Sequence, residues 1–176
     1  MLPYWMHLAV YFGDIEHTPR HASTQPPRTR PWITLMHGEK HMTMNKRMYH
    51  PDGAQPPPDE GWVFVFGSNL AGRHSEGSAL VAAQHFGAQR GVGFGWTSES
   101  SFAIPVKTGQ LETLSIRAIA VAVMGFVGDA QMNPNRKFWV SRVGCELEGY
   151  SDEQIAPLFQ RAPSNCSFAA EWKSYF

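Results

Sequence analysis

The sequence predicts an α/β domain with a mostly parallel mixed sheet, preceded by a proline-rich irregular segment. Three times after residue 60, a short β-rich apolar run is followed by a polar loop and then by a helical pattern. This repeated order favours parallel strands joined by crossover helices. The composition also changes near residue 60, because most of the 13 prolines and most of the 8 histidines precede it. We therefore expect an extended or disordered segment at 1–60 and one domain at 61–176.

The first strand–loop–helix unit begins directly after the composition changes. The apolar run 61–69 predicts a buried strand that ends in Gly-Ser-Asn. Ser75 is the expected N-cap of the following helix, which Gly87 closes. The stretch 91–100 is rich in glycine and predicts a loop.

The second and third units have the same order. The run 101–106 predicts a strand, and apolar residues at helical spacing between 112 and 131 predict the helix after it. The run 137–144 predicts the third strand. A capping box of Ser151 and Gln154 then predicts a short helix. All loops that follow these strands are expected at one edge of the sheet.

Composition limits the classes of function. The formal net charge of the 176 residues is zero, so the chain shows no basic excess for nucleic acid or for an anionic membrane. The histidines of 1–60 match no zinc spacing and are expected to be solvated, so we predict neither a metal nor a cofactor. Cys145 and Cys166 fit free thiols of a reducing compartment. No apolar run is long enough to span a membrane, and we expect a cytoplasmic protein.

The first loop, 67–77, follows the strand with Asn69. In parallel sheets ligands bind at the carboxyl ends of strands. An asparagine at that place can hydrogen-bond a sugar hydroxyl, and the N-terminus of the next helix can bind an anion. The alternative is an ordinary strand-to-helix connection capped by Ser75.

The other two loops have similar alternatives. In loop 91–100, Trp96 can stack on a base or anchor the loop. Lys107 ends the second strand and can hold a phosphate or act as a nucleophile, although a solvated lysine is the ordinary case. Loop 144–150 offers backbone donors beside two glycines, or only a tight turn, and no P-loop Lys-Ser/Thr follows. Cys145 is expected as a small buried residue rather than a nucleophile.

Three stretches taken together resemble a known family. FVFGSNLAGRHSEGSALVAAQHFGA, SFAIPVKTG and FWVSRVGCELEGYSDEQIAPLF resemble, in order and spacing, macrodomain-like proteins of phages and bacteria. They resemble more distantly the macrodomains that remove ADP-ribose from glutamate. The resemblance covers about residues 61–165. It implies a three-layer α/β/α fold that binds ADP-ribose or a related nucleotide, in the host cytoplasm if the protein is phage-encoded.

The resemblance also assigns residues to roles. It implies that Asn69 meets the distal ribose, that loop 72–77 wraps the pyrophosphate, and that loop 144–149 closes over both. Lys107 falls near a lysine that the glutamate-specific hydrolases use covalently, and Glu148 falls at their catalytic aspartate, so these two are the expected catalytic pair. The expected ligand-binding residues are Gly67, Ser68, Asn69, Gly72, Arg73, His74, Ser75, Gly77, Trp96, Gly144, Cys145, Gly149 and Tyr150.

The sequence departs from the family at acidic positions, and the function stays open. Glu146 and Glu148 replace small residues of the nearer relatives, and Glu76 adds another carboxylate. A carboxylate about 4 Å from a phosphate costs about 4 kcal/mol at an effective dielectric near 20. Either these side chains point outward or phosphate binding is weakened. The chain is therefore a nucleotide-binding module, a hydrolase of ADP-ribosyl adducts, or a non-enzymatic interaction protein that uses 1–60 as a docking arm.

Overall fold

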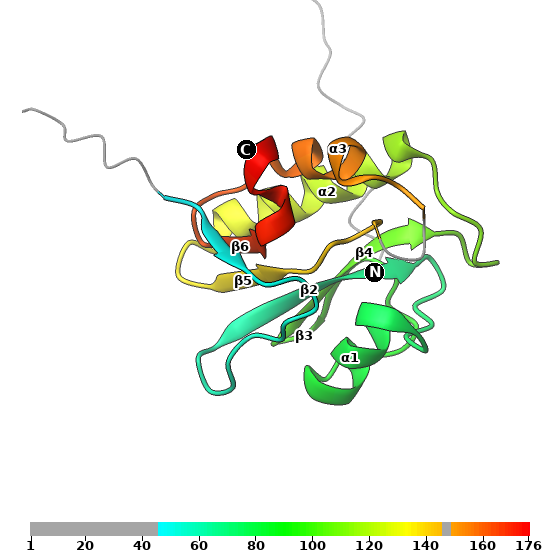
Figure 1. The fold of residues 1–176 in the computed structure, drawn as a ribbon. Coiled ribbons are helices and arrows are strands. Elements are labelled where there is room, and N and C mark those ends of the chain that lie inside the picture. The colour runs from blue at the N-terminus through cyan, green and yellow to red at the C-terminus, as the bar shows by residue number, and fades with distance from the viewer. Residues whose placement is uncertain (1–45, 146–148) are drawn as a thin grey trace, which may run out of the picture. The chain divides into compact units, whose positions relative to one another are not determined.

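The computed structural model describes residues 46–145 and 149–176 and has a six-stranded sheet at its centre (Figure 1). The strand order is β1-β6-β5-β2-β4-β3, and every neighbouring pair is parallel except β3 and β4. The predicted mostly parallel mixed sheet is therefore confirmed. The strands are β1 (Met48–His50), β2 (Trp62–Asn69), β3 (Gly95–Ser98), β4 (Ser101–Lys107), β5 (Lys137–Val140) and β6 (Cys166–Ala169).

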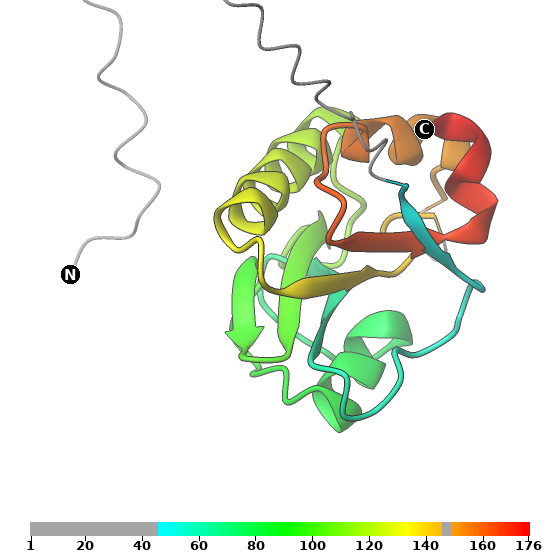
Figure 2. The same cartoon turned by 90° about the vertical axis from the view of Figure 1, so that its left-hand side faces the viewer.

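Helices cover both faces of this sheet (Figures 1 and 2). They are α1 (Gly77–His85), α2 (Ile116–Met132), α3 (Asp152–Ile155) and the 3-10 helices η2 (Ala156–Phe159) and η3 (Ala170–Tyr175). The alternation of β2 explains the two cores, because Val63 and Val65 pack with α2 whereas Phe64 and Phe66 pack with α1. Among the described residues, no helix has the length and apolar character that a membrane crossing needs.

The strongest sequence patterns form the expected elements. β2 and β4 occupy the two predicted apolar runs, and the helical spacing before Gln131 becomes α2. The Oγ of Ser115 caps α2 by accepting the Ala118 N–H at 3.3 Å. The predicted capping box opens α3. β5 ends at Val140 rather than at 144, because the Val143 N–H turns back to the Ser141 carbonyl at 2.7 Å.

The predicted N-cap of α1 is wrong. The helix begins at Gly77, Glu76 is its N-cap residue, and no side chain caps it. A cap at Ser75 would require the helix to begin at residue 76. The helix begins one residue later, at Gly77, where a φ of 52° turns the chain. Gly87 does follow the helix as predicted, with a φ of 65° in the left-handed region that helix ends favour.

Two strands lie where the sequence predicted irregular chain. β3 lies in the glycine-rich stretch 91–100, and it pairs with β4 so that Trp96 is opposite Phe102. β1 lies within the proline-rich segment 1–60 and pairs with β6. Its three residues are followed at once by Pro51, which a short edge strand tolerates. The described part of that segment, from residue 46, therefore contributes to the sheet, whereas 1–45 lie outside the described residues.

Candidate functional site

A pocket lies at the carboxyl ends of β2, β4 and β5 and in front of the N-terminus of α1. β2 and β4 end together because Asn69 is the register partner of Lys107. The parallel sheet thus brings loops that are distant in sequence to one edge, as expected. The predicted site residues that line this pocket are Gly67, Ser68, Asn69, Arg73, Ser75, Gly77, Lys107 and Gly144.

Asn69 organises the loop in which it stands. Its side chain is buried, with 6% of its surface exposed. Its Oδ1 accepts the backbone N–H groups of Ala71 and Arg73, both at 3.1 Å, and its Nδ2 donates to the Arg73 carbonyl at 3.0 Å. Sequence reasoning gave Asn69 a contact with ribose, and the structure adds an internal role that no motif had signalled.

The glycines of the first two loops pack against each other. A Cβ on Gly72 would lie 2.4 Å from the Val92 backbone nitrogen, and Gly72 has a φ of 63°. A Cβ on Gly93 would lie 2.5 Å from the Asn69 carbonyl oxygen. The Gly91 N–H donates to the Gly72 carbonyl at 3.0 Å. These glycines permit close approach of backbone to backbone, so their presence in the sequence does not by itself indicate a ligand.

His74 is buried beneath this loop, where it contacts Phe66 and Ser68 of β2. It has no exposed surface, and its ring packs edge-on against Phe66 at 5.0 Å. Its Nε2 lies 3.2 Å from the Oγ of Ser68, and burial lowers its pKa. His74 was a predicted ligand contact, but it is not among the residues that line the pocket.

Trp96 is not brought to the pocket. Its ring packs against Phe102 at 5.6 Å and Phe138 at 5.9 Å, and its Nε1–H donates to Asp129 at 3.3 Å. The Arg136 guanidinium lies over the ring at 5.2 Å. These contacts make Trp96 an anchor of β3, which was the alternative to base stacking.

The charges around the pocket favour an anion. Arg73 and Lys107 line it together with the first residues of α1, and Glu76 is the opposing carboxylate. The first helical hydrogen bond of α1 is the one from the Leu80 N–H to the Glu76 carbonyl at 3.0 Å. The N–H groups of residues 77–79 precede that bond and thus have no acceptor within the helix.

The third loop presents Gly144 to the pocket and holds its other predicted residues elsewhere. Gly144 has a φ of 81°, and a Cβ there would lie 3.2 Å from Ile155 Cδ1, so any other residue would be strained at this position. Cys145 and Tyr150 pack against the core, and the Tyr150 hydroxyl donates to the Leu114 carbonyl at 2.8 Å. Gly149, with a φ of 81°, does not line the pocket. Glu146 and the predicted catalytic Glu148 lie outside the described residues.

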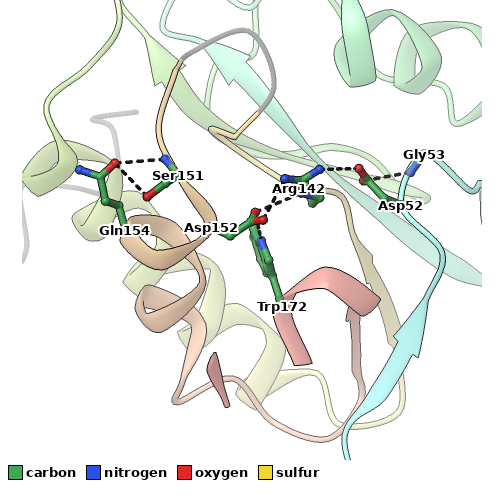
Figure 3. A network of polar contacts seen from close by, with 7 residues as sticks. All are labelled: Asp52, Gly53, Arg142, Ser151, Asp152, Gln154 and Trp172. Atoms are coloured by element: carbon green, nitrogen blue, oxygen red, sulfur yellow. Dashed lines mark hydrogen bonds and ion pairs between the residues drawn. The ribbon is translucent and has the colours of Figure 1, made fainter. Parts of the chain in front are cut away.

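Arg142 is a pocket residue that sequence reasoning missed. Its guanidinium binds Asp152 through Nε at 3.1 Å and Nη2 at 2.9 Å, and it binds Asp52 through Nη1 at 2.7 Å (Figure 3). Hydrogen bonds to both carboxylates raise the pKa of Arg142. The signal in the sequence was weak, because Asp52 stands 90 positions away.

A buried histidine lies on the α1 face of the sheet. His50 of β1 stacks on Trp139 at 4.0 Å, and its Nδ1 lies 2.8 Å from the Ser167 Oγ. Burial lowers its pKa to about 4, although Asp52 opposes this effect. His50 is therefore neutral at pH 7 and acts there as a packing residue.

The described residues do not point to a metal centre. Within residues 46–145 and 149–176, no group of three histidine, cysteine or acidic side chains could hold a metal ion.

The chain matches no protein-family model, no curated protein and no solved structure.

Proposed function

We propose that the protein binds ADP-ribose or a related nucleotide at the carboxyl edge of its sheet. The observation that carries this proposal is that Arg73, Lys107 and the uncapped start of α1 line the same pocket. The sequence resemblance to macrodomains agrees with it. Helices on both faces of the sheet also fit the three-layer arrangement that the resemblance implies.

The chemistry of the pocket suits a pyrophosphate. Two cationic side chains and the N–H groups of residues 77–79 supply positive potential and hydrogen-bond donors. Gly67 and Gly144 both line the pocket and lie close to each other, since a Cβ on Gly67 would lie 4.0 Å from the Gly144 nitrogen. The missing side chains of both glycines are replaced there by the core residue Val106, so these glycines bring the two loops together rather than open the pocket.

Calorimetric titration of the full chain with ADP-ribose tests the proposal. We expect saturable binding that weakens about tenfold in Arg73→Gln, the loss that one charge-assisted hydrogen bond causes. Arg90→Gln is the matched control, because Arg90 is also an exposed arginine but does not line the pocket. Absence of binding at millimolar ADP-ribose in the parent protein would refute the proposal.

A hydrolase is the second candidate, and the position of Lys107 in the pocket favours it. The Lys107 amine would attack the anomeric carbon of ADP-ribosyl-glutamate, forming a C–N bond as the ester C–O bond breaks; the glutamate carboxylate leaves, and the proton of the amine passes to solvent. Water then releases ADP-ribose from the lysine. The resemblance gives Glu148 the acid–base role.

Release of ADP-ribose from glutamate-modified protein separates the two candidates. In a hydrolase, Lys107→Ala abolishes release while Arg90→Gln keeps the parent rate. Binding without release in the parent protein supports the binding module alone. Equal release rates in the parent and Lys107→Ala would remove Lys107 from the mechanism.

A further inference from the structure

Arg142 connects three segments that are far apart in the chain. The residue follows β5, Asp52 follows β1, and Asp152 opens α3 (Figure 3). The contact with Asp152 is two-pronged, which fixes the plane of the guanidinium. A lysine could not make this arrangement, because an ammonium group is a single point charge.

The two carboxylates are themselves held in place. The Gly53 N–H donates to Asp52 Oδ1 at 3.0 Å, and the Trp172 Nε1–H donates to Asp152 Oδ1 at 2.7 Å (Figure 3). The side chains of Arg142 and Asp152 are 23% and 20% exposed. Oriented partners and low exposure distinguish this network from an ordinary surface ion pair, which contributes little.

The charge of the network argues against a direct contact between Arg142 and a phosphate. One guanidinium faces two carboxylates, so the three groups together carry a net charge of −1. Although Arg142 lines the pocket, its positive charge is already compensated there. We therefore expect Arg142 to affect the affinity for a ligand by positioning the pocket residues, rather than by its charge.

The network supports the part of the pocket wall that contains Gly144. The Cys145 N–H donates to the Arg142 carbonyl at 3.1 Å, which closes a tight turn over residues 142–145, called the Gly144 turn. Gly144 in turn packs against Ile155 of α3. The ion pair with Asp152 therefore holds α3 against the same turn that forms the wall.

We propose that Arg142 is a positioning residue whose contacts with Asp52 and Asp152 fix the Gly144 turn and thereby set the affinity of the pocket. The effect on affinity rests on the proposed function. The effect on the turn does not, and it can be measured without any ligand.

The thiol of Cys145 reports on the turn. It is partly exposed and hydrogen-bonds to Asp152, whereas Cys166 is buried with its pKa raised to about 12 by that burial and serves as a silent thiol. We would measure the reaction of the full chain with 5,5′-dithiobis(2-nitrobenzoate) over a range of pH. In Arg142→Gln we expect the thiolate of Cys145 to react about tenfold faster, the factor that one charge-assisted hydrogen bond gives in an equilibrium.

The sign of the change separates position from charge. Removal of a cation near Cys145 raises its thiol pKa and slows the reaction at fixed pH, whereas loosening of the turn speeds it. Arg142→Lys keeps the charge but loses the two-pronged contact, so it is expected to react fast as well. Arg136→Gln is the control for charge, since Arg136 contacts the Glu99 carbonyl, and its rate should equal that of the parent.

The milder Asp52→Asn keeps the pair with Asp152, and it decides the question if Arg142→Gln does not fold. We expect its Cys145 rate to rise by a smaller factor, about threefold. A parent-like rate in Asp52→Asn and in Arg142→Lys would overturn the proposal.

The ligand arm of the experiment is titration with ADP-ribose. We expect Arg142→Gln to bind about tenfold more weakly than Arg136→Gln, with both folded by circular dichroism. Equal affinities would overturn the role of Arg142 in the pocket. If the parent protein does not bind, the proposed function fails, and the Cys145 rates still decide whether Arg142 positions the turn.

Discussion

The two loops that line the pocket are held by different kinds of contact. The loop after β2 is fixed by neutral hydrogen bonds of Asn69 and by glycine contacts between backbones. The loop after β5 is fixed by the ion pairs of Arg142. Neutral contacts keep their strength over pH and salt, whereas ion pairs depend on both. The loop after β2 is therefore expected to be insensitive to salt, and to pH until the buried His74, whose pKa is lowered, gains a proton, whereas the loop after β5 should respond to both.

The largest effect is expected from Gly72→Ala in the neutral loop. The new methyl group would meet the Val92 nitrogen at 2.4 Å and would stand at a φ of 63°. Overpacking and left-handed backbone together should lower the free energy of unfolding by about 3 kcal/mol or more, measured by urea denaturation. Gly91→Ala is the matched control, because it has a φ of 87° but nothing within 4 Å, and it should lose only about 1–2 kcal/mol. Equal losses in the two variants would show that the close contact is unimportant.

Asp152→Asn tests the charged loop. Burial raises the pKa of Asp152, but hydrogen bonds from Trp172, Arg142 and Cys145 outweigh it and hold the pKa below the ordinary 3.8. The ionised carboxylate thus stabilises the fold above pH 3.8, and this stabilisation is lost as the pH falls through the lowered pKa. At pH 7 the variant should be less stable by about 2 kcal/mol.

The pH dependence of that difference is the informative measurement. Urea denaturation of parent and variant should give curves that converge below pH 3.8, where the parent also becomes neutral at this position. His50 also lowers the free energy of unfolding as the pH falls below 6.5, because its pKa in the folded protein is about 4. This contribution is common to both proteins and cancels in the difference. A difference that stays constant down to the lowest pH would contradict an ionic role.

Tyr150→Phe removes a neutral contact from the loop after β5. In the parent protein the Tyr150 hydroxyl donates to the Leu114 carbonyl at 2.8 Å. The loss should be about 1 kcal/mol in the free energy of unfolding, the usual contribution of a neutral hydrogen bond. Unlike the effect of Asp152→Asn, it should be the same at pH 7 and below pH 3.8.

The smallest effect is expected from Glu76→Gln at the start of α1. Removal of the one carboxylate among the described lining residues should tighten ADP-ribose binding about two- to fivefold in low salt, and less in high salt. Glu99→Gln, between β3 and β4, is the remote control. Weaker binding by Glu76→Gln would mean that this side chain contacts the ligand favourably.

The sequence predicts those parts of the fold in which local pattern and tertiary packing agree. β2, β4 and α2 combine long apolar patterns with clear ends, so their burial follows from periodicity. β1 and β3 are short edge strands whose few residues are defined by their partners in the sheet. No local pattern predicts a pairing of Tyr49 with Phe168, which is distant in the chain.

The candidate site was predictable in place but not in detail. Loops at the carboxyl ends of parallel strands identify the edge, and Lys107 and Gly144 lie there as the sequence suggests. Gly72, His74 and Trp96 are of residue types that also suggested ligand binding, but they serve packing, and only their three-dimensional contacts reveal this. Arg142 was missed because its importance depends on a carboxylate in a segment whose prolines suggested irregular chain.

The place of β1 at the edge of the sheet has a consequence for shortening the chain. A chain cut back to residue 61, where the composition changes, would lose both β1 and Asp52. The backbone N–H and C=O groups of β6 that face β1 would then be unpaired, while those that face β5 stay paired. An open strand edge is a template for addition of another chain. The three residues of β1 therefore also protect the protein from aggregation, and trimming should stop before Met48.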